Sequence, residues 1–122
     1  MSRKGFKDLI AWQRAKHVAV LIYGITLQNK ALAQDFGLRD QLRRSVVSIA
    51  SNLAEGDERD TDKDAVRFFY FAKGSLAELR TQIEIAHEIG YLEKDMFDKL
   101  EADCEEIGKM IGGLIKVRQG RS

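Results

Sequence analysis

Apolar residues recur every three to four positions along four stretches of the chain, separated by short polar or glycine-marked stretches. This spacing places the apolar side chains on one side of an α-helix. The pattern predicts helices at about residues 8–28, 36–55, 62–89 and 94–117. The chain has no proline, the residue that interrupts helix interiors most strongly, so nothing in these stretches opposes the assignment.

The predicted helix ends carry their own signals. Thr61 is followed three residues later by Asp64, a spacing that resembles a capping box and indicates the start of the third helix. Gly56 is expected just past the end of the second helix and Gly90 just past the third, because glycine readily adopts the backbone conformation that follows a helix C-terminus.

Short connections make consecutive helices antiparallel neighbours. We therefore predict an all-α fold, an antiparallel up-down-up-down four-helix bundle that forms one domain over residues 1–122. The fourth helix has the most regular apolar seam, with steps of three and four residues that suit close helix packing. That seam consists of Phe97, Leu100, Cys104, Ile107, Ile111 and Leu114.

Two further expectations follow from a turn near residues 58–59 between the second and third helices. Arg39 then lies level with Glu78, and we expect Arg39 or Arg43 to form an ion pair with Glu78. Gly74 lies inside the third helix, where glycine costs about 1 kcal/mol relative to alanine. We expect a neighbouring helix or a long arginine side chain to approach Gly74 closely.

A polar stripe runs beside the apolar stripe on the second and third helices. We predict that it forms an interhelical hydrogen-bond network that fixes the helix register, because polar groups inside bundles often specify packing. The alternative is a ligand pocket lined by Ser75, Glu78 and Gln82. The residues assigned to the network are Asn52, Glu55, Ser75, Glu78 and Gln82.

Helices one and three are apolar over a wider arc than one bundle interior can cover. The surplus on the third helix includes Phe68, Tyr70 and Phe71. We take these three residues as candidates for a surface that binds another copy of the chain.

Composition and charge restrict the classes of function. The 122 residues are 44% hydrophobic and 32% charged, within the globular range, and no apolar run is long enough to span a membrane. The single cysteine, Cys104, excludes an intramolecular disulfide and favours a cytoplasmic location. The net charge of +1 lacks the strong basic excess of a dedicated nucleic-acid binder.

A nucleic-acid contact would therefore need a local basic patch. Arg39, Arg43 and Arg44 on the second helix are the candidates, because arginine matches the geometry of phosphate oxygens. The same arginines could instead form salt bridges within or between subunits. At the end of the bundle that holds both termini, basic Arg3, Lys4 and Arg118 are expected to neutralise the acidic loop around residues 55–64.

The residues that could support catalysis or metal binding are few. Glu84 and His87 have the Glu-x-x-His spacing of di-iron bundles, but those sites need two such motifs and two more glutamates. Cys104 lies in the apolar seam without an activating partner. We predict no catalytic residue, no cofactor and no metal site.

Several motifs together resemble one known family, the four-helix-bundle proteins named after 23S ribosomal RNA intervening sequences. The resemblance covers about residues 6–117. The motifs that carry it begin with Asp8-Leu9-Ile10-Ala11-Trp12-Gln13-Arg14-Ala15 and Gln41-Leu42-Arg43-Arg44-Ser45-Val46-Val47-Ser48-Ile49. They continue with Ser51-Asn52-Leu53-Ala54-Glu55-Gly56, Gly74-Ser75-Leu76-Ala77-Glu78-Leu79 and Gly90-Tyr91-Leu92.

The resemblance implies an up-down-up-down bundle that assembles into homopentamers and has no enzymatic activity. A related branch, the accessory protein of diversity-generating retroelements, works with nucleic acid. Two hypotheses follow. The first is a non-enzymatic, homo-oligomeric scaffold whose biochemical role is unassigned. The alternative is a nucleic-acid-binding accessory protein that acts on RNA or DNA through an arginine-rich surface of the assembly.

Overall fold

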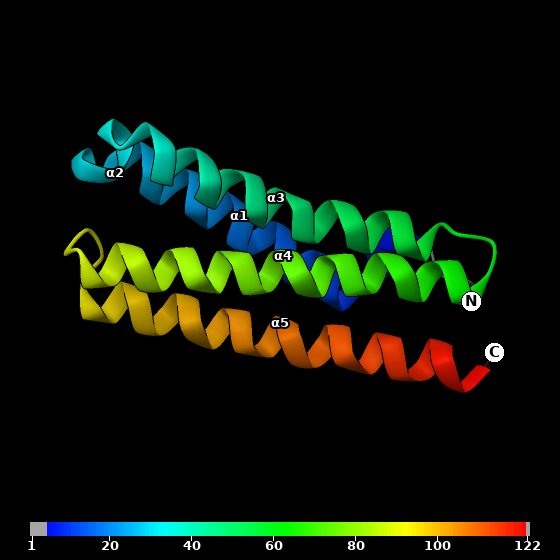
Figure 1. Ribbon diagram of the computed structural model, residues 1–122. Coiled ribbons are helices and arrows are strands. Elements are labelled where there is room, and N and C mark those ends of the chain that lie inside the picture. Colours follow the sequence, from blue (N-terminus) through cyan, green and yellow to red (C-terminus); the bar gives the residue numbers. More distant parts are fainter. Residues whose placement is uncertain (1–4, 122) are drawn as a thin grey trace.

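The protein is an antiparallel bundle of four long helices (Figure 1), so the prediction of an all-α bundle is confirmed. The computed structural model describes residues 5–121. The elements are a 3₁₀ turn η1 (Phe6–Asp8), α1 (Ile10–Gln28), α2 (Lys30–Gln34), α3 (Phe36–Asp57), α4 (Asp62–Glu88) and α5 (Lys94–Arg121). None of the helices in this part of the chain combines the length and the apolar character that crossing a membrane requires.

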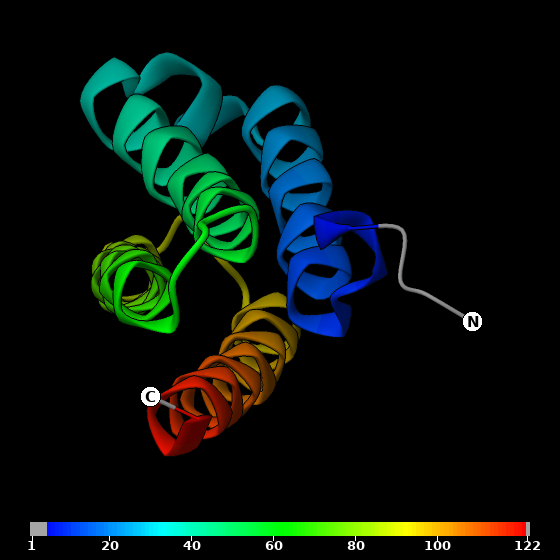
Figure 2. The same ribbon diagram turned by 90° about the vertical axis from the view of Figure 1, so that its right-hand side faces the viewer.

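The four long helices stand at the corners of a square (Figure 2). α3 packs against α1 and α4, and α5 packs against α4 and, less extensively, against α1. α1 and α4 are therefore diagonal neighbours and run in the same direction. We call the end where α1 begins and α5 ends the terminal end, and the opposite end, which carries α2, the loop end.

The loop end differs from the prediction, because the expected loop at about residues 29–35 contains the short helix α2. Asn29 caps the start of α2, where its side chain accepts from the Leu32 N–H at 3.1 Å. Asp35 caps the start of α3, where its side chain accepts from the Leu38 N–H at 3.1 Å. Asn29 also donates to the Tyr91 carbonyl at 2.7 Å. The Tyr91 hydroxyl donates to Asp35 at 3.1 Å, and this bond raises the pKa of Tyr91. These contacts tie α2 to the turn between α4 and α5.

The predicted signals at the two ends of α4 are confirmed. Thr61 caps α4 by accepting from the Asp64 N–H at 3.1 Å. Gly90 has a φ of 88°, and the next residue donates its N–H to the Ala86 carbonyl at 2.8 Å, which closes the C-terminus of α4.

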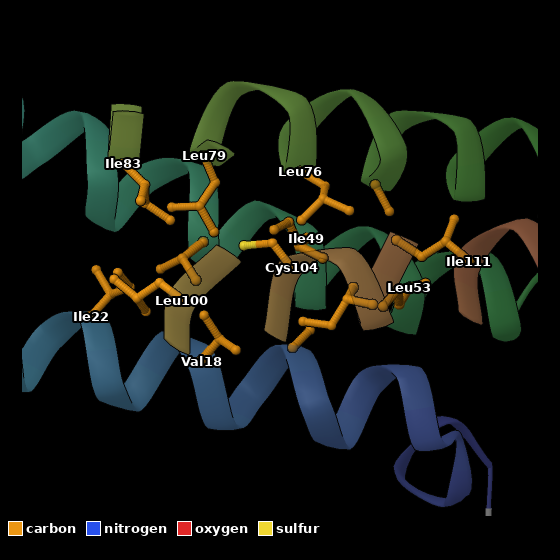
Figure 3. Packing of buried hydrophobic residues seen from close by; sticks show 14 of the residues in the cluster. Val18, Ile22, Ile49, Leu53, Leu76, Leu79, Ile83, Leu100, Cys104 and Ile111 are labelled. Carbon is orange, nitrogen blue, oxygen red and sulfur yellow. The ribbon is translucent and has the colours of Figure 1, made fainter. Parts of the chain in front are cut away.

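The interior is a continuous apolar core with residues from all four long helices (Figure 3). A turn near residues 91–92 predicts that Leu76 lies level with Ile107, and the register of α4 on α5 agrees. His87 stacks on Phe97 with 4.2 Å between ring centroids, and Leu76 lies beside Gly108. Fully buried core side chains labelled in Figure 3 include Val18, Ile22, Ile49, Leu53, Leu79, Ile83, Leu100, Cys104 and Ile111.

The register of α3 on α4 differs from the prediction, because α3 continues through Gly56 to Asp57. The turn between the two helices comes later, and Ser45 rather than Arg39 lies level with the region of Glu78 to Gln82. Gly56 is not past the helix end but is buried within it. A Cβ atom at Gly56 would stand 2.6 Å from Cε1 of Phe69, so glycine permits this close approach.

The expectation for Gly74 is wrong within the protomer. No heavy atom of the described chain lies within 4 Å of a Cβ placed at Gly74, and the residue is exposed. The close approach that the sequence predicted for Gly74 occurs instead at Gly56.

A buried ion triad closes the terminal end. Arg118 of α5 donates to Asp57 at 3.2 Å and to Asp62 at 3.1 Å, and its guanidinium lies 5.8 Å from the centroid of the Phe69 ring. The Asp57 side chain is only 1% exposed, so bulk water screens this pair little. The expected neutralisation of the acidic loop is thus provided by Arg118, while Arg3 and Lys4 lie outside the described residues.

Replacing Gly56 with alanine tests the close approach. The new methyl group collides with the fully buried Phe69 ring, so we expect a loss of about 1–3 kcal/mol in the free energy of unfolding, as is usual for overpacking. The matched control is Gly113→Ala on α5, where the new atom meets nothing within 4 Å. That control is expected to raise stability by up to about 1 kcal/mol, and equal effects of the two substitutions in urea denaturation would contradict our account.

Replacing Arg118 with glutamine tests the triad. Removing one partner of a buried pair costs about 3 kcal/mol, because the guanidinium that binds the buried Asp57 carboxylate at 3.2 Å is lost. Thermal or urea unfolding measures the loss. The control is Lys99→Gln, whose exposed pair with Asp103 contributes at most about 0.5 kcal/mol. A loss no larger than that of the control would show that the triad does not stabilise the fold.

Candidate functional site

A ladder of polar side chains joins α3 to α4. Ser45 donates to Gln82 at 2.7 Å, Ser48 and Ser75 share a hydrogen bond of 2.8 Å, and Asn52 donates to Ser48 at 3.0 Å. Ser45 and Ser75 are buried, and both have partners, so the ladder stabilises this interface instead of leaving polar groups unpaired. Three of the residues predicted for the network, Asn52, Ser75 and Gln82, therefore lie in one interhelical arrangement.

Glu55 and Glu78 do not join the ladder. Glu55 pairs with Arg59 of its own segment at 3.2 Å, near the terminal end. Glu78 is exposed, and it forms no ion pair with any residue between 5 and 121. The predicted pair of Arg39 or Arg43 with Glu78 is thus wrong, because the later turn changes the register and both arginines lie on the side of α3 that faces α1.

The three arginines of α3 do not form one open cluster. Arg43 donates to Thr26 of α1 at 2.9 Å and stacks 4.7 Å from the Tyr23 ring. Arg39 donates to the Ala33 carbonyl at 3.2 Å and to Asp40 at 3.0 Å. Arg44 is exposed and makes no hydrogen bond or ion pair within the described chain. Two of the three candidate phosphate contacts therefore already have intramolecular partners.

An apolar groove lies on the outer surface where α3 meets α4. Its volume is about 500 Å³. The lining residues are Leu38, Gln41, Ala77, Glu78, Thr81, Gln82 and Ile85. Ile85 in its lining is 45% exposed, and Ile89, one helical turn further along the chain, is 53% exposed. We call the outward residues Ala77, Glu78, Thr81, Ile85 and Ile89 the α4 face.

The aromatic candidates lie on α4 nearer the terminal end. Tyr70 and Phe71 are both 48% exposed, whereas Phe68 is half-buried. Phe68 packs edge-on against Phe71 with centroids 5.6 Å apart, and the Arg59 guanidinium lies 4.2 Å from the Phe68 centroid. Tyr70 and Phe71 extend the apolar surface of α4 beyond the groove.

A second apolar surface lies on α1, where the sequence predicted surplus apolar residues without identifying them. Val20 and Leu27 are 68% and 69% exposed, and Tyr23 beside them is partly covered by Arg43. A shallow hollow of about 570 Å³ adjoins Val20, and Lys16 and Trp12 line it. We call Lys16, Val20, Tyr23 and Leu27 the α1 face. The sequence did contain a signal, because Val20 and Leu27 are apolar but lie outside the two apolar stripes of the first helix. One stripe consists of Leu9, Trp12, Ala15, Ala19 and Ile22, and the other of Val18, Leu21 and Ile25.

The residues considered for metal binding and nucleophilic chemistry have structural roles. His87 bonds to the Leu92 carbonyl at 2.9 Å through Nδ1 and stacks on Phe97. Its partners are therefore Leu92 and Phe97, and Glu84 is not among them. No group of three His, Cys, Asp or Glu side chains in residues 5–121 has the arrangement of a metal site. Burial, together with the nearby Glu101 carboxylate, raises the pKa of the Cys104 thiol to about 12.

Comparison with known proteins identifies one family. A family model described as 23S rRNA-intervening sequence protein matches residues 7–113. A solved structure from Bacteroides thetaiotaomicron, a protein of unknown function from the S23 ribosomal protein family, has the same fold with a TM-score of 0.82. The two chains are 20% identical, and the match covers 88% of this chain and 99% of the other. No curated protein matches the chain.

The thiol of Cys104 is expected to resist modification in the folded protein. Thiolate is the reactive form, and a pKa of about 12 keeps the group protonated at pH 8. We expect labelling by a disulfide reagent at pH 8 to be at least about a hundredfold slower than in the urea-unfolded chain. Equal labelling rates in the two states would contradict the buried, neutral thiol.

Proposed function

Because the chain belongs to the family of 23S rRNA-intervening sequence proteins, whose structural relative has no known function, we propose that it is a cytoplasmic, non-enzymatic scaffold that works as a homo-oligomer. Five copies is the number that the family resemblance implies. The observation that carries the proposal is the pair of exposed apolar surfaces, the α1 face and the α4 face, on a bundle whose interior is already complete.

The exposed apolar side chains favour association on energetic grounds. Fully burying a Leu, Ile or Val side chain contributes about 1.5–3 kcal/mol relative to leaving it in water. Val20, Leu27 and Ile89 are each more than half exposed, and Ile85 is nearly so. A second copy of the chain is available at the same concentration as the first, so self-association is the most direct way to cover these residues.

The chemistry of the surface supports a scaffold over an enzyme. The groove beside α4 is apolar and carries one carboxylate, Glu78. The Thr81 hydroxyl in its lining donates to the Ala77 carbonyl at 2.9 Å, and no second acid or base among the lining residues could activate that hydroxyl. The polar ladder between α3 and α4 is internally satisfied, so its groups serve packing. A role in binding and assembly needs only surface shape and charge.

Nucleic-acid binding is the second hypothesis, and the arrangement of the arginines gives it less support. Arg39 and Arg43 are engaged with Asp40 and Thr26, which leaves Arg44 as the available candidate on α3. With a net charge of +1, any affinity for RNA would depend on how the assembly clusters Arg44 from several copies. Titration with RNA at low and at high salt would measure that contribution separately from assembly.

The mass in solution and one substitution test the scaffold proposal. We expect light scattering at micromolar concentration to give a multiple of the chain mass. Ile85→Glu should convert the protein to monomers, because a charged side chain in an apolar contact is left desolvated. The control is Val117→Glu on α5, which alters a valine outside the two faces that is 59% exposed, compared with 45% for Ile85, and should leave the mass unchanged. A monomeric wild-type protein would overturn the proposal.

A further inference from the structure

The exposed apolar residues are concentrated on two helices that lie diagonally opposite each other. On α1 they are Ile10, Val20, Tyr23 and Leu27, and on α4 they are Tyr70, Phe71 and Ile85, with Ile89 directly after the helix. α1 and α4 do not contact each other in the bundle, so their outer surfaces point to different sides of the molecule (Figure 2). One partner docking at one place cannot cover both surfaces.

We infer that the two surfaces bind each other between copies: the α1 face of one protomer docks on the α4 face of the next. This head-to-tail, heterologous contact rests on the proposed self-association and specifies which surfaces make it. Every copy then uses both of its apolar faces, whereas a two-fold contact that pairs one face with itself leaves the other exposed.

The charges on the two faces favour the unlike pairing. α1 has no acidic residue along its whole length. Its Arg14 pairs with Glu106 of α5 at 3.2 Å, and its Lys16, on the α1 face, forms no ion pair within residues 5–121. The α4 face and its surroundings carry Glu78, Glu84 and Glu88, and the basic residue in that stretch, Arg80, is engaged with Glu101 of α5. Pairing α1 with α1 or α4 with α4 would bring like charges together, and pairing α1 with α4 brings opposite charges together.

The two faces also lie at the same height along the bundle. Arg43 bonds to Thr26 of α1, and Ser45, two residues further along α3, bonds to Gln82 of α4. Thr26 and Gln82 are therefore nearly level. Rotation about an axis parallel to the helices keeps every residue at its height, so in a closed ring the stretch from Val20 to Leu27 meets the groove between Ala77 and Ile85.

The shapes of the two faces are complementary. The α1 face projects Val20 and Leu27, which at 68% and 69% exposed extend furthest into solvent among the exposed apolar side chains. The α4 face offers the apolar groove of about 500 Å³, lined by Leu38, Ala77 and Ile85. Because α1 and α4 run in the same direction, the two helices would pack in parallel, as ring symmetry requires of them.

Both faces lean toward α3, which determines the orientation of the ring. The groove is partly formed by Leu38 and Gln41 of α3, and Tyr23 of the α1 face stacks on Arg43 of α3. Because both contact faces lean toward α3, each protomer is narrower on its α3 side, like a wedge. Successive copies then close into a ring with α3 and Arg44 nearest to the ring axis. α5 then lies on the outside, where its exposed pairs of Lys94 with Asp98 and Lys109 with Glu105 face solvent.

Mixing two face variants tests the inference directly. Leu27→Glu disables the α1 face, and Ile85→Glu disables the α4 face. We expect each variant alone to be a folded monomer by light scattering and circular dichroism. An equimolar mixture should form a one-to-one dimer of twice the chain mass, because each variant retains the face that the other lacks. The control is the double variant Leu27→Glu/Ile85→Glu, which retains neither face and should leave either single variant monomeric when the two are mixed.

The outcomes separate this inference from the proposed function. A monomeric wild-type protein overturns the scaffold proposal. An oligomeric wild type whose two variants stay monomeric when mixed overturns the heterologous contact alone, and so does either variant that keeps the wild-type mass. If Leu27→Glu fails to fold, Lys16→Glu and Glu78→Lys replace the pair: each should weaken assembly at low salt at least about tenfold, and the double variant should restore it.

Discussion

The close contact between Gly56 and Phe69 holds together the part of the molecule on which the rest depends. Phe69 is fully buried, lies against a glycine of α3 where no side chain fits, and is covered by the guanidinium of Arg118 from α5. One aromatic ring thereby sets the distance between α3 and α4 and anchors α5 to both. The ion triad of Arg118 with Asp57 and Asp62 closes the same corner, so packing and charge reinforce each other at the terminal end.

The polar ladder extends this constraint along α3 and α4. Its bonds are directional, so they accept one register of Ser45 and Ser48 against Gln82 and Ser75, where a purely apolar interface would tolerate sliding. The fixed register determines what the outer surface looks like. It brings Leu38 and Gln41 beside Ala77 and Ile85 to form the groove, and it leaves Glu78 exposed at the groove, with no ion pair to any residue from 5 to 121.

A bundle with a complete core and two surplus apolar faces is suited to assembly. The core needs none of the residues Val20, Leu27, Ile85 and Ile89, and their exposure is costly for an isolated protomer in water. The chain belongs to the family of 23S rRNA-intervening sequence proteins, and its solved structural neighbour is a protein of unknown function. What the fold presents to a partner is two apolar surfaces, the α1 face and the α4 face, at fixed positions on the bundle.

The sequence alone determined the helices, their order and the bundle, because apolar periodicity, capping residues such as Thr61 and the glycine stop at Gly90 are local signals that the folded chain obeys. It also determined the α4–α5 register, since a short turn after Gly90 leaves little freedom. Only the tertiary structure decided the α3–α4 register. The sequence suggests that α3 ends at Gly56, but the helix continues to Asp57, and Gly56 provides the space that the buried Phe69 ring occupies. For the same reason the sequence assigned Arg39 or Arg43 to Glu78, whereas Arg43 binds Thr26. The sequence predicted surplus apolar surface on the first helix but could not identify Val20, because whether an apolar residue is covered depends on where the other helices stand.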